Sequence, residues 1–397
     1  MDGFSYDAVL VGGCGHVGLP LGLAFAKNGM RVALYDISAD AVEHVSRGEM
    51  PFMEEGADRI LKELAGKRIF ATTNPQVVSE AGSVIVIIGT PVDEHQNPEP
   101  HKVVDAVREL GRYLRPSQLL VLRSTIYPGT TALIEAVIDD LGLDIDIAFC
   151  PERIAEGRAI QELFELPQIV SSRTQKGFDR ASELFSLLTA KIVRLTPEEA
   201  ELAKLFTNTW RYIKFATANQ LFMIAENFGL DYETIRRGVS EDYPRAADLP
   251  SAGFAAGPCL LKDTLQLAAF NNNEFILGQA AINVNEGLPY FIVSKLARKH
   301  KLGSLKIGIL GMAFKGESDD TRSSLAYKLK RVLRYRAGEV FTTDPYIEGD
   351  PDLLPLEEVL ENSDLLIIGS PHQIYREIVT ATPMVDFWGL RGPKSGL

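Results

Sequence analysis

The chain has 397 residues, of which 46% are hydrophobic and 24% charged, and its formal net charge is −12. This composition is typical of a globular protein with two or three domains, and the acidic balance argues against a nucleic-acid partner or an anionic membrane surface. The three cysteines, Cys14, Cys150 and Cys259, do not form a disulfide framework, which favours a cytoplasmic protein. The start of the chain lacks a basic signal-peptide region, and no apolar run reaches the roughly 20 residues of a membrane span, so we expect no membrane partner.

The first half of the chain predicts a doubly wound α/β domain. Short apolar runs predict buried parallel strands at 8–11, 31–35, 83–88, 119–122, 145–149 and 168–171. Helical patterns lie between them, at 16–28, 103–114 and 130–141. Alternation of this kind is typical of an open parallel sheet covered by helices. We therefore expect a Rossmann-like domain over residues 1–195.

The middle of the chain predicts a helical region over residues 196–302. Thr196 followed by Pro197 and two acids is a good helix start, and no strand pattern or proline intervenes before about Gly229. A helix of roughly 30 residues would be about 45 Å long. That length favours an interface in a homodimer or higher homo-oligomer, with a monomeric interior as the alternative. Further helical patterns lie at 232–239, 260–271 and 275–299, the last with possible bends at Gly278 and Gly287.

The last part of the chain, residues 303–397, predicts a smaller α/β domain. Strand-like runs lie at 306–311, 340–344 and 364–369, and a helix is expected near 323–335. The order of a strand, a turn, a helix and a strand ending in Asp repeats the beginning of the chain. The predicted fold class is therefore α/β, with two Rossmann-like doubly wound domains joined by a helical middle that contains a long central helix.

The segment Gly13-Cys14-Gly15-His16-Val17-Gly18 matches the dinucleotide fingerprint G-x-G-x-x-G, between a strand and a helix. We expect Gly13 to permit the tight turn, Gly15 to let the backbone approach a pyrophosphate, and Gly18 to allow close packing of the helix. Asp36 ends the next strand, where it would bind ribose hydroxyls and repel a 2′-phosphate, so NAD is favoured over NADP. A glycine turn without a ligand is the alternative. The fingerprint residues expected to contact the cofactor are Gly13, Gly15, His16, Val17 and Gly18.

Small polar residues follow two later strands, in Gly89-Thr90-Pro91 and in Ser124-Thr125. Ligands of open α/β sheets bind beyond the carboxyl ends of strands. We therefore expect Thr90, Pro91 and Thr125 to line the cofactor pocket, with a turn and a helix cap as the alternative. Glu152 also follows a strand and is a candidate catalytic carboxylate, with an ordinary turn acid as the rival interpretation.

The segment Gly257-Pro258-Cys259-Leu260-Leu261-Lys262-Asp263 places a thiol, an amine and a carboxylate within five positions. A thiolate is a good nucleophile toward carbonyls, and a nearby cation lowers the pKa of a thiol. A thiol beside a hydride acceptor suggests oxidation of an aldehyde through a covalent thioester. A small buried cysteine before a helix start is the alternative.

Together these motifs resemble the UDP-glucose/GDP-mannose dehydrogenase superfamily of nucleotide-sugar 6-dehydrogenases, over essentially the whole chain. The resemblance implies two successive NAD-linked oxidations of a UDP-sugar at C6, from alcohol to aldehyde to carboxylate, and no metal. The segments that carry it are Gly13–Leu21, Gly89–Asp93, Ser124–Thr131, Pro151-Glu152-Arg153, Ala200–Leu205 with Asn208, Gly257–Asp263, Leu310–Lys315 and Asp319–Arg322.

The resemblance also implies roles for individual residues. Cys259 would attack the C6 aldehyde, and Lys204 and Asn208, four positions apart on one helix face, would stabilise the developing oxygen charge. Asp263 would position or deprotonate water, with Lys204 as its partner in proton transfer. Glu152 would serve in hydrolysis, and Thr125 would lie near the reacting carbon. The implied substrate-binding residues are Glu152, Arg153, Glu156, Lys204, Asn208, Gly257, Lys262, Lys315 and Arg322, the last with a possible role toward a neighbouring subunit.

The identity of the sugar depends on segments that conflict. Pro258 and the pair Ala255-Ala256 depart from the family pattern in the loop expected to embrace the sugar. Pro151-Glu152-Arg153 resembles members that act on N-acetylated UDP-sugars, whereas Ala155-Glu156-Gly157 and Lys262-Asp263 resemble members that act on UDP-glucose. The main expectation is oxidation of UDP-glucose to UDP-glucuronate. The alternatives are a UDP-N-acetylhexosamine (ManNAc or GlcNAc) 6-dehydrogenase, a two-electron hydroxyacid dehydrogenase and a non-catalytic nucleotide-sugar binder.

Overall fold

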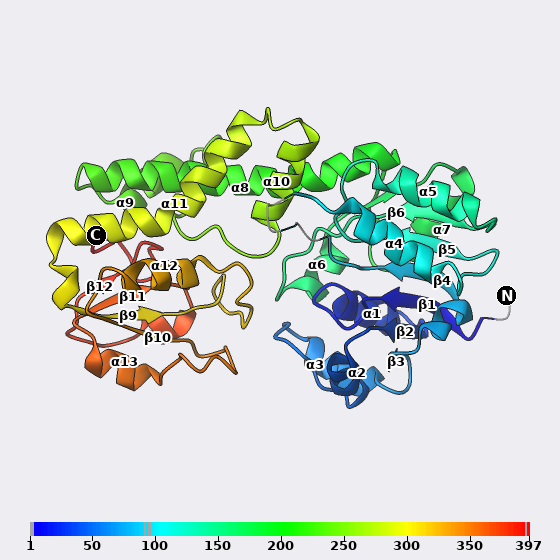
Figure 1. Ribbon diagram of the computed structural model, residues 1–397, viewed down its shortest axis with the longest axis horizontal. Coiled ribbons are helices and arrows are strands. Elements are labelled where there is room, and N and C mark those ends of the chain that lie inside the picture. The colour runs from blue at the N-terminus through cyan, green and yellow to red at the C-terminus, as the bar shows by residue number, and fades with distance from the viewer. Residues whose placement is uncertain (1–3, 91–92, 94–96, 394) are drawn as a thin grey trace. The chain divides into compact units, whose positions relative to one another are not determined.

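The computed structural model describes residues 4–90, 93, 97–393 and 395–397 (Figure 1). The chain divides into two compact units, Met1–Phe206 and Thr207–Leu397. Most of the helical region and the smaller α/β domain therefore belong to one compact unit. The boundaries predicted after residues 195 and 302 remain predictions. No helix among the described residues is both long and apolar enough to cross a membrane.

The first unit is built on an eight-stranded sheet with the order β3-β2-β1-β4-β5-β6-β7-β8. All neighbouring strands are parallel except β6 and β7, which are antiparallel and pair at Phe149 and Ser171. The strand order reverses between β1 and β4, which is where doubly wound sheets bind their ligands. The strands are β1 (Tyr6–Val11), β2 (Val32–Tyr35), β3 (Ile69–Thr72), β4 (Ala81–Val86), β5 (Leu119–Leu122), β6 (Asp146–Phe149), β7 (Gln168–Ser171) and β8 (Ile192–Leu195).

Both faces of this sheet are covered. In β5, Leu119 and Val121 pack into one hydrophobic cluster, whereas Leu120 and Leu122 pack into a second cluster on the other face. Burial on both faces explains why the strands have continuous apolar sequences rather than alternating ones. The helices of this unit are α1 (Gly18–Lys27), α2 (Ala39–Ser46), α3 (Ala57–Leu64), α4 (Pro100–Leu110), α5 (Thr130–Asp140), α6 (Ala159–Glu165) and α7 (Gln175–Ser186), with a 3-10 helix at Pro75–Glu80.

The long helix predicted from Pro197 is present as α8 (Pro197–Asn227), with 31 residues (green in Figure 1). Its start has reciprocal capping bonds: the Thr196 N–H donates to Glu199 Oε2 over 2.8 Å, and the Glu199 N–H donates to Thr196 Oγ1 over 3.4 Å. The helix begins in the first unit and continues into the second.

The second unit combines helices with a four-stranded parallel sheet in the order β10-β9-β11-β12. Helices α12 and α13 cover opposite faces of this sheet (Figure 1). The expected second Rossmann-like domain is therefore confirmed. Its elements are α9 (Tyr232–Ser240), α10 (Leu260–Phe270), α11 (Ile276–Lys299), α12 (Leu325–Arg334), α13 (Leu356–Asn362), β9 (Lys306–Leu310), β10 (Glu339–Thr343), β11 (Leu365–Ile368) and β12 (Met384–Val385), with 3-10 helices at Leu302–Ser304 and Gln373–Arg376.

An aspartate holds the first glycine turn in both sheets. In the first sheet, Asp36 Oδ2 accepts the N–H of Cys14 over 3.0 Å. In the second, Asp344 Oδ2 accepts the N–H groups of Met312 and Ala313 over 2.7 and 3.1 Å. The Asp344 carboxylate also lies 3.0 Å from His372 Nε2, and both side chains are 0% exposed. The repeated sequence pattern thus corresponds to a repeated hydrogen-bonded turn.

Candidate active site

The glycine fingerprint forms the turn between β1 and α1, and the glycine before the fingerprint contributes as well. The left-handed residue of this turn is Gly12, with φ +77°. A Cβ on Gly13 would lie 2.6 Å from the Leu10 carbonyl oxygen and 2.9 Å from the Leu34 Cα, so this position has no room for a side chain. A Cβ on Gly18 would lie 2.5 Å from the Gly12 carbonyl oxygen, so the start of α1 packs directly against the turn.

Gly15 leaves space for a ligand. Among the described residues, the one atom within 4 Å of a Cβ on Gly15 would be the Gly12 carbonyl oxygen, at 3.8 Å. No side chain caps the N-terminus of α1, whose N-cap residue is Val17, and backbone N–H groups at a helix start attract phosphate. The His16 ring packs on Phe52, with 4.0 Å between the ring centroids. This turn therefore fits the pyrophosphate of NAD.

Asp36 lies at the carboxyl end of β2, as expected. Its two carboxylate oxygens accept the N–H groups of Cys14 and Ser38, and each carboxylate oxygen has more than one lone pair. Further along the sheet, Thr90 Oγ1 donates to the Thr125 carbonyl oxygen over 2.7 Å, so the structure brings these two predicted cofactor residues together. Pro91 lies outside the described residues.

Glu152, at the carboxyl end of β6, is 6% exposed and fully engaged. Its Oε1 accepts the N–H groups of Arg153 and Ile154 over 2.7 and 3.1 Å, and its Oε2 pairs with Arg123 Nη2. Arg123 is 0% exposed, donates to the Cys150 carbonyl oxygen over 2.9 Å and stacks on Phe185. The buried ion pair thus fixes the segment that carries Glu152 and Arg153.

The segment after Arg153 is held by a second carboxylate. Glu54 accepts the N–H of Gly157 over 2.8 Å and that of Ala159, the first residue of α6, over 2.7 Å. Glu156 directly precedes the anchored Gly157 and is half-buried. The predicted substrate residues Glu152, Arg153 and Glu156 therefore share one loop whose two ends are fixed.

Cys259 differs from the other two cysteines. It is exposed and is the N-cap residue of α10. Burial raises the pKa of both Cys14 and Cys150 to about 12, in Cys14 with help from the Asp36 charge. A helix N-terminus stabilises negative charge, which suits a thiolate. Of the three thiols, Cys259 is therefore the one placed to react.

Asp263 lies in the first turn of α10 and is 0% exposed. Its Oδ2 accepts the Nδ2 hydrogen of Asn208 over 2.6 Å. Its Oδ1 accepts no hydrogen bond from the described residues and lies 3.9 Å from Nζ of Lys262. The second unit thus brings together Cys259, Lys262, Asp263 and Asn208. Lys204, one helical turn before Asn208 on α8, is 9% exposed.

The loop before Cys259 is anchored at two glycines. The Asn219 side chain accepts the Gly253 N–H and donates to the Gly253 carbonyl oxygen, both over 2.9 Å, and also donates to Oδ1 of the buried Asn285 over 2.9 Å. Gly257 has φ +97°, and a Cβ there would lie 2.8 Å from the Phe314 ring. The loop conformation is therefore set by a buried amide pair and by close packing.

Phe314 belongs to the loop after β9 that carries the predicted substrate-binding residues Lys315 and Arg322. Lys315 lies next to it, with Nζ 5.5 Å from the Phe314 ring centroid. Arg322 is exposed and is held by Asp320, which accepts its backbone N–H over 2.8 Å and its guanidinium. The second unit thus connects the loop of Lys315 and Arg322 to the loop before Cys259 through the close packing of Phe314 on Gly257.

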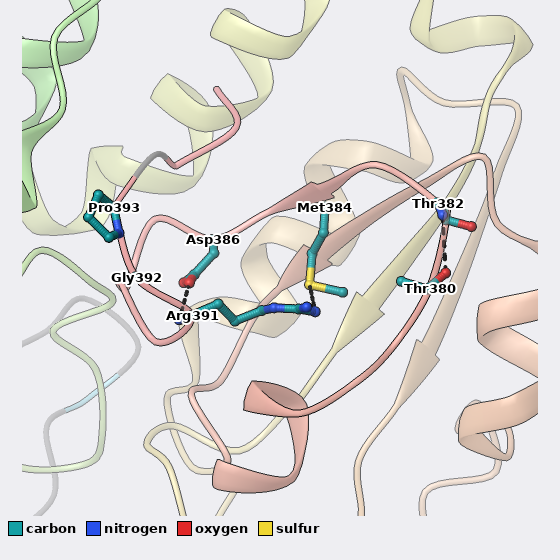
Figure 2. Close-up of a pocket in the computed structure, with 7 residues that line it drawn as sticks. All are labelled: Thr380, Thr382, Met384, Asp386, Arg391, Gly392 and Pro393. Carbon is teal, nitrogen blue, oxygen red and sulfur yellow. Dashed lines mark hydrogen bonds between the residues drawn. The ribbon is translucent and has the colours of Figure 1, made fainter.

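A separate surface pocket of about 240 Å³ lies near the C-terminus (Figure 2). In it, Asp386 accepts the N–H of Arg391 over 2.7 Å, and Arg391 Nη1 lies 3.3 Å from the Met384 sulfur. None of the predicted site residues lines this pocket, so we assign it no part in the site. Its lining residues are Thr380, Thr382, Met384, Asp386, Arg391, Gly392 and Pro393.

Sequence reasoning missed Gly12, Arg123 and Asn219. A signal was available for the first two, because Gly12 directly precedes the fingerprint and Arg123 directly follows an apolar strand. Asn219 is one polar residue in a long helix, and its partner Gly253 lies 34 residues away. Only the tertiary structure identifies it.

Comparison with known proteins identifies the family. Residues 7–189 match the NAD binding domain of the UDP-glucose/GDP-mannose dehydrogenase family, residues 198–287 its central domain and residues 308–390 its UDP binding domain. The UDP-N-acetyl-D-mannosamine dehydrogenase of Pyrococcus horikoshii is 30% identical over 384 residues, which cover 93% of this chain and 90% of that protein. The Escherichia coli (strain K12) protein of the same name is 27% identical over 406 residues, which cover 94% and 96%.

Solved structures agree with this assignment. The UDP-D-ManNAc dehydrogenase of Pyrococcus horikoshii aligns with a TM-score of 0.86 at 28% identity, covering 94% of this chain and 91% of that chain. A UDP-glucose dehydrogenase of Pyrobaculum islandicum aligns with a TM-score of 0.89 at 26% identity, covering 98% and 95%. The chain therefore belongs to the UDP-glucose/GDP-mannose dehydrogenase family and is a nucleotide-sugar dehydrogenase that uses NAD and takes a UDP-sugar as its substrate.

Proposed function

We propose that this protein oxidises the C6 alcohol of a UDP-N-acetylhexosamine, UDP-N-acetylmannosamine first among them, to the uronic acid through a thioester on Cys259. The observation that carries the proposal is the exposed thiol of Cys259 at the N-terminus of α10, one turn before the buried carboxylate of Asp263. NAD supplies the acceptor for one hydride in each of the two oxidations. Gly15, the start of α1 and Asp36 would hold it, and Thr90 and Thr125 would line its pocket.

The residues of the chain supply the remaining chemistry. The C6 alcohol must first lose a hydride from carbon and a proton from its hydroxyl to give the aldehyde. The Cys259 thiolate then attacks the C6 aldehyde: the S–C bond forms, and the carbonyl π electrons move to oxygen. Asn208 has two amide hydrogens, and only one is donated to Asp263. Its second N–H and the Lys204 ammonium would stabilise this oxygen.

Loss of hydride from C6 then converts the thiohemiacetal to a thioester, which water must open. Water attacks the thioester carbon, the S–C bond breaks, and the thiolate leaves as the carboxylic acid forms. Asp263 Oδ1, which accepts no hydrogen bond from the described residues, would take the proton of the attacking water. Glu152 and its Arg123 partner would hold the loop around the sugar.

The choice of sugar differs from the main sequence-based expectation. UDP-glucose is not supported by the curated relatives reported above, which are UDP-N-acetyl-D-mannosamine dehydrogenases, whereas the alternative expectation agrees with them. The segment Pro151-Glu152-Arg153 also favours an N-acetylated UDP-sugar, because it resembles family members that act on such sugars. The structural similarity to a UDP-glucose dehydrogenase keeps UDP-glucose as the competitor to test.

Steady-state assays with a panel of UDP-sugars test the proposal. We expect the highest kcat/KM for UDP-N-acetylmannosamine and two NADH per sugar oxidised. One NADH per sugar would contradict the thioester route, and a higher kcat/KM for UDP-glucose would contradict the sugar assignment. Cys259→Ser is expected to bind both ligands but to form no acid.

We also propose that the protein is a homodimer or a higher homo-oligomer, with the second-unit part of α8, α9 and the turn between them in the interface. Phe228 is 78% exposed and Trp210 59%, with further exposed apolar side chains at Leu221, Ile224, Leu230, Ile235 and Val239. Exposed apolar surface of this kind marks interaction sites. Sedimentation of Phe228→Glu should show a weakened oligomer, whereas Val379→Glu, at a 98% exposed position, should leave it unchanged. A wild-type monomer would overturn this proposal.

A further inference from the structure

Glu201, on the second turn of α8, is a buried carboxylate with three partners. It is 1% exposed. Its Oε2 accepts the Gly129 N–H over 2.6 Å, and its Oε1 accepts the Thr131 N–H over 2.8 Å and the Thr131 hydroxyl over 2.7 Å. These partners lie about 70 positions earlier in the sequence, at the start of α5. Glu201 therefore ties two helices of the first unit together.

The carboxylate occupies a helix start that has no cap of its own. The N-cap residue of α5 is Gly129, with φ +91°, and as a glycine it has no side chain that could cap the helix. A local Ser, Thr or Asp at this position would satisfy the free N–H groups without involving a second element. The Glu201 carboxylate caps α5 from another helix, so it also fixes the distance and rotation between α8 and the start of α5. A local cap residue would not do this. A buried charge is tolerated only with such bonds, so the geometry is strictly required.

Predicted site residues lie close to Glu201 on α8 and in the segment that enters α5. Lys204 is three positions after Glu201, which places the two side chains on the same face of α8. The segment that enters α5 carries Thr125, whose carbonyl oxygen accepts the Thr90 hydroxyl over 2.7 Å. Glu201 therefore links α8 by hydrogen bonds to the start of α5. The backbone before α5 leads from there to Thr125 and its bond with Thr90.

We propose that Glu201 is a positioning residue that sets Lys204 against the Thr125 segment. This inference rests on the proposed function, in which Lys204 stabilises charge on the substrate oxygen and Thr125 lies near the reacting carbon. A small displacement of such a group lowers the rate of the chemical step more than it weakens binding. Glu201 itself touches neither substrate nor cofactor in this proposal.

The test compares E201Q with E198Q. In E201Q the amide nitrogen faces an N–H donor at Gly129 or Thr131, so at least one bond becomes a donor–donor contact. Glu198 is the matched control, because it lies on the same helix and pairs with Arg173 at the surface. We expect kcat of E201Q to fall about 10- to 100-fold, as for other small misplacements of catalytic groups. The KM values for NAD and UDP-sugar should stay within about threefold, and E198Q should match the wild type.

A second variant covers the case in which E201Q does not fold. T131V removes only the hydroxyl bond and should lower kcat by a smaller factor with the same unchanged KM values. Wild-type kinetics in E201Q, or an equal loss in E198Q, would overturn the inference.

Crystal structures of the wild type and E201Q give a readout that does not depend on activity. We expect Lys204 Nζ to shift relative to Thr125 in the variant, and an unchanged position would overturn the positioning role. A wild-type protein that forms no NADH with any UDP-sugar would instead refute the proposed function, while the structural comparison would still decide the role of Glu201.

Discussion

Asn208 donates its Nδ2 hydrogen to Oδ2 of Asp263 over 2.6 Å, and both side chains are buried. The bond joins α8 to the helix that begins after Cys259. Asp263 has a second oxygen that accepts no hydrogen bond from the described residues. One oxygen of the carboxylate is thus committed to holding the helices, while the other is available for the chemistry of the site.

Removing Asn208 should cost stability as well as activity. In Asn208→Ala the buried Asp263 carboxylate loses its donor, which should lower the free energy of unfolding by about 1–3 kcal/mol. Urea unfolding of Asn208→Ala, Asp263→Ala and the double variant measures the coupling between the two residues. Additive losses in this cycle would show that the bond contributes nothing.

Cys259 should be the thiol that reacts in the native protein. Cys14 and Cys150 are buried, and burial raises their pKa to about 12. Brief treatment with iodoacetamide at neutral pH should therefore modify Cys259 alone, as read by mass spectrometry of peptides. Denatured protein provides the control, in which all three cysteines should react. Labelling of Cys14 or Cys150 in the folded protein would contradict the assignment.

Gly257→Ala should disturb the loop before the nucleophile. The added Cβ would lie 2.8 Å from the Phe314 ring, at a residue with φ +97°. Strain of this kind costs about 1–3 kcal/mol, and we expect the KM for UDP-sugar to rise. Gly287→Ala, inside α11, is the matched control. Its Cβ would have no neighbour within 4 Å among the residues that the structure describes, and Ala is favoured over Gly in a helix by about 1 kcal/mol. Equal melting temperatures for the two variants would contradict this prediction.

The second domain should lose stability in acid through Asp344. Burial raises the pKa of this carboxyl, but the interaction with His372 and the hydrogen bonds from Tyr346 and Met312 outweigh burial, so the pKa lies below its usual value. A lowered folded-state pKa contributes stability above the unfolded value of about 4, and that stability is lost as the pH falls through the folded pKa.

The difference in unfolding free energy between wild type and Asp344→Asn should therefore shrink as the pH falls below about 4. Urea unfolding of both proteins over a series of pH values measures this difference in free energy. Glu348→Gln, an exposed carboxylate of the same domain, serves as the control and should show a difference that does not vary with pH. A constant difference for Asp344→Asn would contradict the assignment.

The sequence predicted the elements that depend on local pattern. The run Leu119–Leu122 was predicted correctly because both of its faces are buried, and α8 was predicted because a capping motif precedes a long segment without breakers. The strand Ile192–Leu195 was not predicted, because it is partly exposed and has no clear alternation. Helix α11 runs without a break over Ile276–Lys299 and has Pro289 in its interior, and the possible bends at Gly278 and Gly287 remain predictions.

The candidate site could be predicted only in part. Motifs identified the chemistry of Cys259, Asp263 and the glycine turn, because residue type and spacing carry that information. The partners of Glu201 and the ion-pair partner of Glu152, Arg123, could not be predicted, because they lie about 70 and 29 positions away. The sugar was assigned to UDP-glucose on short segments that conflict with one another, and similarity over the whole chain favours the alternative.

Substitution of Asp36 should separate two contributions to cofactor binding. Asp36→Asn keeps an oxygen acceptor for the Cys14 N–H and removes the charge, whereas Asp36→Ala removes both. Both variants should bind NAD more weakly and discriminate less against NADP, and Asp36→Ala should also unfold at a lower temperature. Titration with NAD and NADP measures the two affinities, and thermal unfolding measures the change in melting temperature. An unchanged preference for NAD over NADP in both variants would exclude the ribose role.

The aspartate that ends the second strand of each sheet therefore limits how the cofactor preference of this enzyme can be redesigned. In the C-terminal sheet the carboxylate is enclosed by His372 and still holds its turn. Residue 36 must likewise accept the Cys14 N–H to hold the first glycine turn, whichever cofactor the enzyme uses. A design for a phosphorylated ribose must retain a hydrogen-bond acceptor there, and the positive charge that it needs belongs at a neighbouring position such as Ile37, which is 88% exposed.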